Sequence, residues 1–144
     1  MDIVETWCQR LRSNGYRLTT PRKAVVETVA LSLRALTPQD VYEAARRRDP
    51  QLGLVTVYRT LEKLESLGLV QRVHQESGCN AYLPQSGGHS HLIICERCGQ
   101  AGYFEGDDLE LLFTRLTAER GYLVRSHWLQ LTGICRDCRA PEGS

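Results

Sequence analysis

Apolar residues recur at helical spacing through the first half of the chain, and turn signals divide them into separate segments. Ile3–Asn14 is the first predicted helix. Two more are expected to begin at the Thr20-Pro21 and Thr37-Pro38 pairs, because threonine caps a helix and proline suits its first turn. A fourth is predicted over Val55–Leu67, and Gly68 follows it as a stop signal. The apolar residues expected on the buried faces are Ile3, Trp7, Cys8, Leu11, Val25, Val26, Val29, Leu33, Val41, Tyr42, Ala45, Leu61, Leu64 and Leu67.

The fourth predicted helix is followed by two segments with the character of β-strands. Leu69–Glu76 and Cys79–Leu83 flank Ser77-Gly78, a two-residue hairpin signal. Short helices followed by a two-stranded wing are typical of a winged helix, a helix-turn-helix variant whose last helix enters the major groove of DNA. We therefore predict a winged-helix domain over residues 1–83.

Polar residues near the start of the fourth helix lie off its leucine stripe, where they could meet bases or phosphates; they are Thr56, Tyr58 and Arg59. A second group around the start of the second helix could hold the DNA backbone: Arg17, Thr19, Arg22 and Lys23. The alternative is that both groups are ordinary solvated side chains on a helical bundle. The run Arg46–Arg48 is interpreted as a solvated helix end.

The second half of the chain begins with a hinge composition at residues 84–88 and is predicted to form an α/β domain over residues 89–144. A strand is predicted over His89–Cys95, a return strand over Ala101–Glu105 and a helix over Asp107–Arg120. Tyr122–Ile134 is predicted as a long strand. Its alternation would place five side chains on one face: Leu123, Arg125, His127, Leu129 and Leu131.

Two Cys-x-x-Cys pairs enclose most of this second domain. Cys95 with Cys98 and Cys135 with Cys138 could supply four thiolates to one tetrahedral zinc. The alternatives are unrelated thiol pairs or a redox motif, which neither pair favours because neither opens a helix after a strand. His89 and His91 alternate on one face of the preceding strand, about 7 Å apart, which suits two ligands of one further ion.

Composition narrows the class of protein. The 144 residues are 42% apolar, without an apolar run near eighteen residues or a signal-peptide start, so we expect a cytoplasmic protein with no membrane partner. Six cysteines without a secretory signal favour metal-binding thiols over disulfides. Residues 1–80 carry 12 basic and 9 acidic side chains, whereas residues 81–144 carry 6 and 8. A basic first half and an acidic, metal-rich second half indicate two different roles.

The sequence resembles the Fur (ferric uptake regulator) family of bacterial metal-responsive repressors. The resemblance rests on the segments 15–22 and 53–61, on His89-x-His91 before Cys95-x-x-Cys98-Gly99, and on His127 ahead of Gly133-x-Cys135-x-x-Cys138. It implies an α+β homodimer with an N-terminal winged helix and a C-terminal dimerisation domain. It also implies that metal binding between the domains orders the two winged helices for a palindromic DNA operator.

The resemblance also implies roles for particular residues. The four cysteines match the structural zinc site of the family. A second site in the dimerisation domain is matched by His89, His91, Glu110 and His127. Three imidazoles and a carboxylate suit Zn²⁺ and would accept Fe²⁺, Mn²⁺, Co²⁺ or Ni²⁺. Tyr58 and Arg59 match the DNA-contacting helix, and Arg17 and Arg22 match the phosphate-contacting region.

The chain departs from the family at the usual sensing site between the domains. The family's histidine before the third helix is missing, since Arg34 and Ala35 occupy that region. Leu83 or Gln85 takes the place of the ligand from the second wing strand, and Ser90 and Leu92 take the places of the histidines that alternate with His89 and His91. A rebuilt site is conceivable on the wing. With Ser77-Gly78 as the turn, Cys79 would pair with Glu76, and His74 would point to the same face. The alternative is that His74 and Cys79 are wing residues without a role.

The leading hypothesis is a metal-dependent repressor of metal homeostasis genes, with zinc preferred as the regulatory ion and iron second. Peroxide sensing is less favoured, because Leu83 takes the wing position where those relatives carry aspartate. A zinc hydrolase or deaminase needs an open metal position, and no His-Glu-x-x-His or nucleophile pattern occurs. A protein-binding zinc ribbon does not explain Tyr58 and Arg59. We expect no enzyme activity and no small-molecule substrate.

Overall fold

The computed structural model describes residues 2–74, 78–85, 90–106 and 109–139. The chain divides into two compact units. The first consists of Met1–Gln85 with Cys98–Gln100, and the second consists of Ser86–Arg97 with Ala101–Ser144. No helix in the described ranges has the length and apolar character needed to cross a lipid bilayer.

Four helices form most of the N-terminal unit: α1 (Ile3–Ser13), α2 (Thr20–Ala30), α3 (Pro38–Ala45) and α4 (Leu54–Ser66). Threonine caps explain two of the starts. Thr37 forms a full capping box with Asp40 at the start of α3. At α2 the cap is Thr19 and not Thr20 as predicted, because the Thr19 side chain accepts from the Arg22 N–H.

The N-terminal unit encloses one apolar core. Fully buried aliphatic side chains come from all four helices, and the largest include Leu11, Val25, Val41, Leu61 and Leu64. The prediction for Leu33 is wrong, because α2 ends at Ala30 and the Leu33 side chain is 83% exposed. Leu67 is only partly buried, because it caps α4. Gly68 follows with a positive φ of 73°, a backbone conformation that glycine adopts at helix ends without strain.

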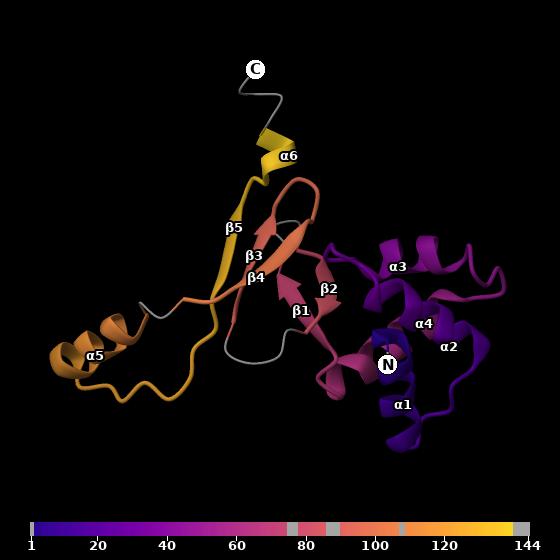
Figure 1. Ribbon diagram of the computed structural model, residues 1–144, viewed down its shortest axis with the longest axis horizontal. Helices are drawn as coiled ribbons and strands as arrows, with labels where there is room; N and C mark the ends of the chain where they lie inside the picture. The colour runs from indigo at the N-terminus through magenta and orange to yellow at the C-terminus, as the bar shows by residue number, and fades with distance from the viewer. Residues whose placement is uncertain (1, 75–77, 86–89, 107–108, 140–144) are drawn as a thin grey trace. The chain divides into compact units, whose positions relative to one another are not determined.

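The wing consists of β1 (Val70–His74) and β2 (Asn80–Pro84), paired antiparallel (Figure 1). His74 pairs with Asn80 and Val73 with Ala81. A two-residue turn at Ser77-Gly78 would pair His74 with Ala81, so the predicted register is wrong by one residue. A shift by one residue exchanges the faces of a strand relative to its partner.

The C-terminal unit contains a three-stranded sheet in the order β4-β3-β5. The strands are β3 (His91–Cys95), β4 (Ala101–Phe104) and β5 (Gln130–Gly133). β4 pairs antiparallel with β3, and β5 pairs parallel with it, so β3 is the central strand. Two helices complete the unit, α5 (Leu109–Arg120) and the short α6 (Arg136–Arg139). None of the described residues of α5 is buried within this chain.

The long strand predicted over Tyr122–Ile134 is wrong for most of its length. Only residues 130–133 form a strand, and residues 122–129 have no regular structure. The ladder begins at the pair Leu92–Gln130, one residue inside the start of β3 at His91. The expected common face from Leu123 to Leu131 therefore does not form, since alternation requires an extended strand.

Candidate metal centre and nucleic-acid interface

The predicted reading helix α4 presents a continuous exposed stripe. Val55 is 62% exposed and Tyr58 is 50% exposed, and Arg59 is also exposed. The opposite side carries Val57, Leu61 and Leu64, which are buried in the core. Thr56 is only partly buried, and its carbonyl oxygen accepts from the Thr60 hydroxyl at 2.7 Å. The core therefore fixes the rotation of α4 and leaves an arginine, a tyrosine and a valine facing outward.

The second predicted DNA-contacting group lies where the chain enters α2. The Thr19 hydroxyl oxygen accepts from the Arg22 backbone N–H at 3.3 Å. The Arg22 guanidinium donates to the Arg17 carbonyl oxygen, and the Arg17 side chain is exposed. Thr19 and Arg22 thus stabilise the N-terminal end of α2, and Arg17 adds an exposed cationic side chain beside them.

The four predicted zinc-binding cysteines come together. Candidate ligand atoms of Cys95, Cys98, Cys135 and Cys138 all lie within 4.8 Å of one another. The Sγ atoms of Cys95 and Cys138 are 3.8 Å apart. Among the described residues this is the one group of three or more histidine, cysteine or acidic side chains close enough to share an ion.

The surroundings of the four sulfur atoms suit a zinc ion. The Cys135 backbone N–H donates to Cys95 Sγ at 3.3 Å, and the Gln100 N–H donates to Cys98 Sγ at 3.4 Å. Such N–H donors stabilise thiolates, which are the form that binds metal. Cys95 is buried and the other three are partly buried, so the cluster is largely closed to solvent. Four sulfur ligands with supporting donors are typical of a structural zinc site.

Two of the predicted second-site ligands are also neighbours. The ring centroids of His91 and His127 lie 5.2 Å apart. His91 is buried, and Phe104 and Phe113 border the histidine pair at 5.6 Å from His91 and 4.8 Å from His127 respectively. The structure therefore brings together two imidazoles that are 36 positions apart in the sequence.

Of the two remaining predicted ligands of the second site, the structure describes Glu110. Glu110 lies in the first turn of α5 and is exposed. His89 falls outside the described residues. Within the described residues, Glu110 does not form a shared-ion group with His91 and His127.

The structure describes two of the three residues of the site suggested on the wing, His74 and Cys79. His74 and Cys79 are both exposed, and Glu76 falls outside the described residues. His74 lies opposite Asn80, so by strand alternation it shares a face with Asn80 and not with Cys79. This register does not favour an ion held by His74 and Cys79 together.

Val55 is a candidate contact residue that was not predicted from the sequence. Val55 is exposed, whereas the other valine of α4, Val57, is buried, and Val55 continues the stripe formed by Tyr58 and Arg59. Its spacing was the available signal, because positions three and four apart on a helix share a face. Apolar side chains on a reading helix are suited to the methyl group of thymine.

Comparison with known proteins supports this arrangement. The family model described as the Ferric uptake regulator family matches residues 13–132. The chain is 31% identical over 132 residues to the ferric uptake regulation protein of Neisseria meningitidis, covering 91% of this chain and 92% of that protein. It is 34% identical over 131 residues to the protein of the same name from Cupriavidus metallidurans, covering 89% and 92%.

The fold has a solved counterpart. The ferric uptake regulator of Helicobacter pylori matches with a TM-score of 0.74 at 22% identity, covering 96% of this chain and 95% of that one. The α+β architecture of a winged helix followed by an α/β unit is thereby shown, together with a four-cysteine cluster suited to structural zinc. This chain belongs to the ferric uptake regulator family, and it is a metal-responsive transcriptional regulator and not an enzyme.

Proposed function

We propose that the chain is a zinc-dependent repressor that binds a palindromic operator as a homodimer. In this proposal residues 1–83 read DNA, residues 84–88 form a hinge, and residues 89–144 bind metal and dimerise. The observation that carries the proposal is the exposed stripe of Val55, Tyr58 and Arg59 on α4, in a chain that also gathers four cysteines.

The stripe supplies three kinds of contact to a major groove. Arg59 can donate two hydrogen bonds to a guanine edge, and Val55 can contact a thymine methyl. Tyr58 can donate from its hydroxyl to a phosphate. Arg17 and Arg22 add positive charge beside the helix, and release of counterions from the DNA would supply much of the affinity.

The exposed apolar side chains of the C-terminal unit support a homodimer. Large hydrophobic residues exposed there are Ile93, Leu111, Leu112, Tyr122, Leu123, Trp128 and Leu131. An isolated subunit with this much apolar surface would be prone to association, whereas a twofold contact between identical units would cover it. Two winged helices related by twofold symmetry match the two half-sites of a palindrome.

His91 and His127 are the core of the proposed second metal site, with His89 and Glu110 as further ligands. These residues come from different segments, so a bound ion would hold the segments together. Ligands that meet only in the DNA-competent arrangement would favour that arrangement when the ion is bound. A tenfold shift requires about 1.4 kcal/mol of differential affinity, which a single ligand set can supply.

Zinc is the proposed regulatory ion because imidazole nitrogen suits it and the site is rich in histidine. Iron is the second candidate, because the relatives described above are named ferric uptake regulation proteins. Imidazole and carboxylate ligands accept both ions, so the donor set alone does not separate them.

To test the proposal, the protein is purified without chelator and used to select duplexes from a random DNA library. The affinity of the protein for the selected duplex is then measured by fluorescence anisotropy. Binding is titrated with Zn²⁺, Fe²⁺ and Mn²⁺ at fixed salt after mild chelation that leaves the four-cysteine site loaded. Zinc-dependent binding to a selected palindrome supports the proposal. Binding restored only by Fe²⁺ supports the second candidate, and DNA binding that no metal alters contradicts both.

A further inference from the structure

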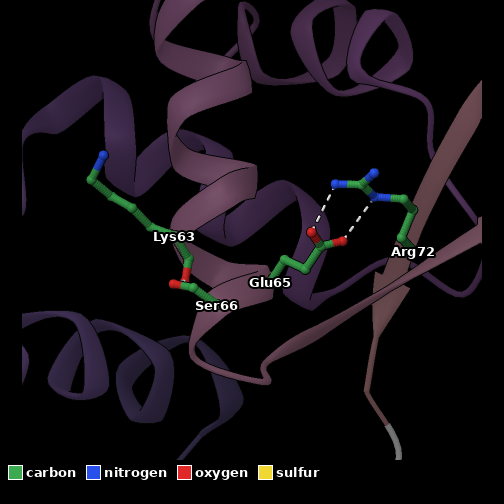
Figure 2. A network of polar contacts seen from close by, with 4 residues as sticks. All are labelled: Lys63, Glu65, Ser66 and Arg72. Carbon is green, nitrogen blue, oxygen red and sulfur yellow. Dashed lines mark hydrogen bonds and ion pairs between the residues drawn. The ribbon is translucent and has the colours of Figure 1, made fainter.

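Arg72 on the wing strand β1 is engaged in a two-point ion pair with the end of the reading helix. Its Nη2 donates to Glu65 Oε1 at 2.8 Å, and its Nε donates to Glu65 Oε2 at 2.9 Å (Figure 2). Glu65 belongs to the last turn of α4, which Ser66 ends. The guanidinium fork therefore joins α4 to the wing in one fixed orientation, since two parallel hydrogen bonds leave little freedom.

The face of the same guanidinium lies near Tyr82 of β2. Arg72 Cζ is 5.8 Å from the ring centroid of Tyr82, and the two residues are cross-strand partners. Tyr82 is buried, and its backbone N–H and carbonyl both bond to Leu36 at 2.8 Å. Arg72 thus touches both strands of the wing and α4, and Tyr82 is itself fixed to the segment that precedes α3.

Besides this contact, the wing is joined to α4 by buried apolar side chains, since Val70 and Tyr82 belong to the same core as Leu61 and Leu64, and by a short connection. Leu69 donates its backbone N–H to the Leu64 carbonyl at 2.9 Å, and the positive-φ residue Gly68 turns the chain between them. A two-stranded hairpin is only marginally stable by itself. Its angle to the helix therefore depends on side-chain contacts, of which the Arg72–Glu65 pair makes the most directional.

We propose that Arg72 is a positioning residue, which sets the angle of the wing to the reading helix and does not bind a phosphate. This inference rests on the DNA binding proposed above. A basic residue on a wing would ordinarily be counted as a phosphate ligand. The two roles predict opposite effects for the loss of Glu65, which makes them separable.

The first test compares Glu65→Gln with Glu27→Gln in the full-length, zinc-loaded protein. Glu27 is a suitable control because its carboxylate also pairs with an arginine, Arg48, at 3.0 Å in the same unit. If only net charge matters, both variants bind the selected duplex slightly more tightly, because each removes one negative charge. If Arg72 positions the wing, Glu65→Gln weakens binding about fivefold while Glu27→Gln does not. Equal tightening by the two variants would overturn the proposal.

The second test replaces the fork while keeping its charge. Arg72→Lys keeps a cation for phosphate but loses the two-point geometry, so we expect affinity to fall about as far as in Arg72→Ala. The slope of log affinity against log salt should not change, because no phosphate contact is removed. Glu65→Arg combined with Arg72→Glu restores an ion pair and should recover part of the loss. Wild-type affinity in Arg72→Lys, with a reduced salt slope in Arg72→Ala, would assign Arg72 to phosphate binding instead.

A third measurement does not use DNA and separates this inference from the proposed function. Amide hydrogen exchange in the wing should rise about tenfold in Arg72→Lys, while α1 and α2 exchange as in the wild type. Unchanged exchange throughout the wing would contradict the positioning role. If the wild-type protein selects no duplex at all, the proposed function fails, and the exchange result still decides what Arg72 does.

Discussion

Cys95 is the most enclosed of the four sulfur ligands. It is buried, it accepts an N–H bond from Cys135, and its sulfur atom lies 3.8 Å from that of Cys138. A buried thiolate without a cation is unfavourable, because burial disfavours the charged form. The geometry around Cys95 therefore couples the folding of the C-terminal unit to metal binding.

We expect Cys95→Ser to lose the structural zinc and to unfold the C-terminal unit, because a serine hydroxyl is a poor replacement for a thiolate. Zinc content by mass spectrometry and thermal unfolding by circular dichroism would measure both effects. Cys79→Ser is the matched control, since Cys79 is exposed and lies outside the cluster. A folded Cys95→Ser protein with full zinc content would contradict this prediction.

Cys8 is a buried cysteine that lies outside the metal-binding cluster. It is fully buried on the core face of α1, and burial, followed by the negative charge of Glu5, raises its pKa above the ordinary value of 9.0. The Cys8 thiol therefore ionises at a lower pH in the unfolded chain than in the folded protein. Its contribution to stability is complete below the pKa of the unfolded chain, and it is lost as the pH rises through the pKa of the folded protein.

The free energy of unfolding of the N-terminal unit should therefore fall as the pH rises above about 9. Tyr82, whose pKa burial also raises, contributes with the same sign at higher pH. Cys8→Ala should lower stability at neutral pH but flatten the alkaline decline, as measured by urea unfolding between pH 7 and 10. An equally steep decline in Cys8→Ala would show that Cys8 is not responsible.

At the scale of the element, α4 combines a core-facing side with a separate outward stripe. The buried residues Val57, Leu61 and Leu64 fix the rotation of the helix, so Arg59 is aimed by packing and not by its own contacts. Lys63 lies on the same helix but stacks over Tyr16 at 5.4 Å from the ring centroid. The two cations of α4 thus have different surroundings.

Arg59→Ala should weaken binding to the selected duplex by about 10- to 100-fold and relax preference at one base pair, because it removes a contact to a base edge. Lys63→Ala removes the same charge from the same helix and should cost much less. Anisotropy titrations on the selected duplex and on single-base variants would measure both effects. Equal losses in the two variants, with unchanged base preference, would remove Arg59 from the reading role.

The helices of the N-terminal unit were predictable because their signals are local. The pair Thr37-Pro38 and the glycine at position 68 set helix ends within a residue or two of the observed ones. The four-cysteine cluster was also predictable, because the Cys-x-x-Cys spacing of metal ligands is a local sequence signal.

The strands were less predictable, because a strand forms only by pairing with another strand, and the local sequence does not determine which residues pair. Residues 122–129 have strand-like composition, but the ladder with β3 begins at Gln130. The wing register differs by one residue from the turn signal, because His74 pairs with Asn80 and not with Ala81. The approach of His127 to His91 was implied by family resemblance, and no local pattern in this chain predicts it.

At the scale of the whole molecule, the two units bury their apolar residues to very different extents. The N-terminal unit has a closed core, whereas no described residue of α5 is buried, and Leu111 is 75% exposed. Helices that remain stable usually bury an apolar face. The exposed apolar side chains of α5 are the ones that the proposed homodimer would cover.

Leu111→Glu should raise the dissociation constant of the homodimer by about 30-fold or more, because a charge would be placed in the proposed apolar contact. Sedimentation velocity at several concentrations would measure the change. Leu33→Glu is the control, since Leu33 is also exposed but belongs to the N-terminal unit. A Leu111→Glu protein that associates as tightly as the Leu33→Glu protein would place the contact elsewhere.

The pairing of Leu36 with Tyr82 also affects the behaviour of the protein at high concentration. A two-stranded ribbon has two open edges, and each could recruit a strand from another molecule. The two backbone bonds from Leu36 occupy donors and acceptors on the outer edge of β2, while Pro84 at the end of that strand has no N–H to offer. The outer edge of β2 therefore does not present a full row of backbone groups to a strand of another molecule.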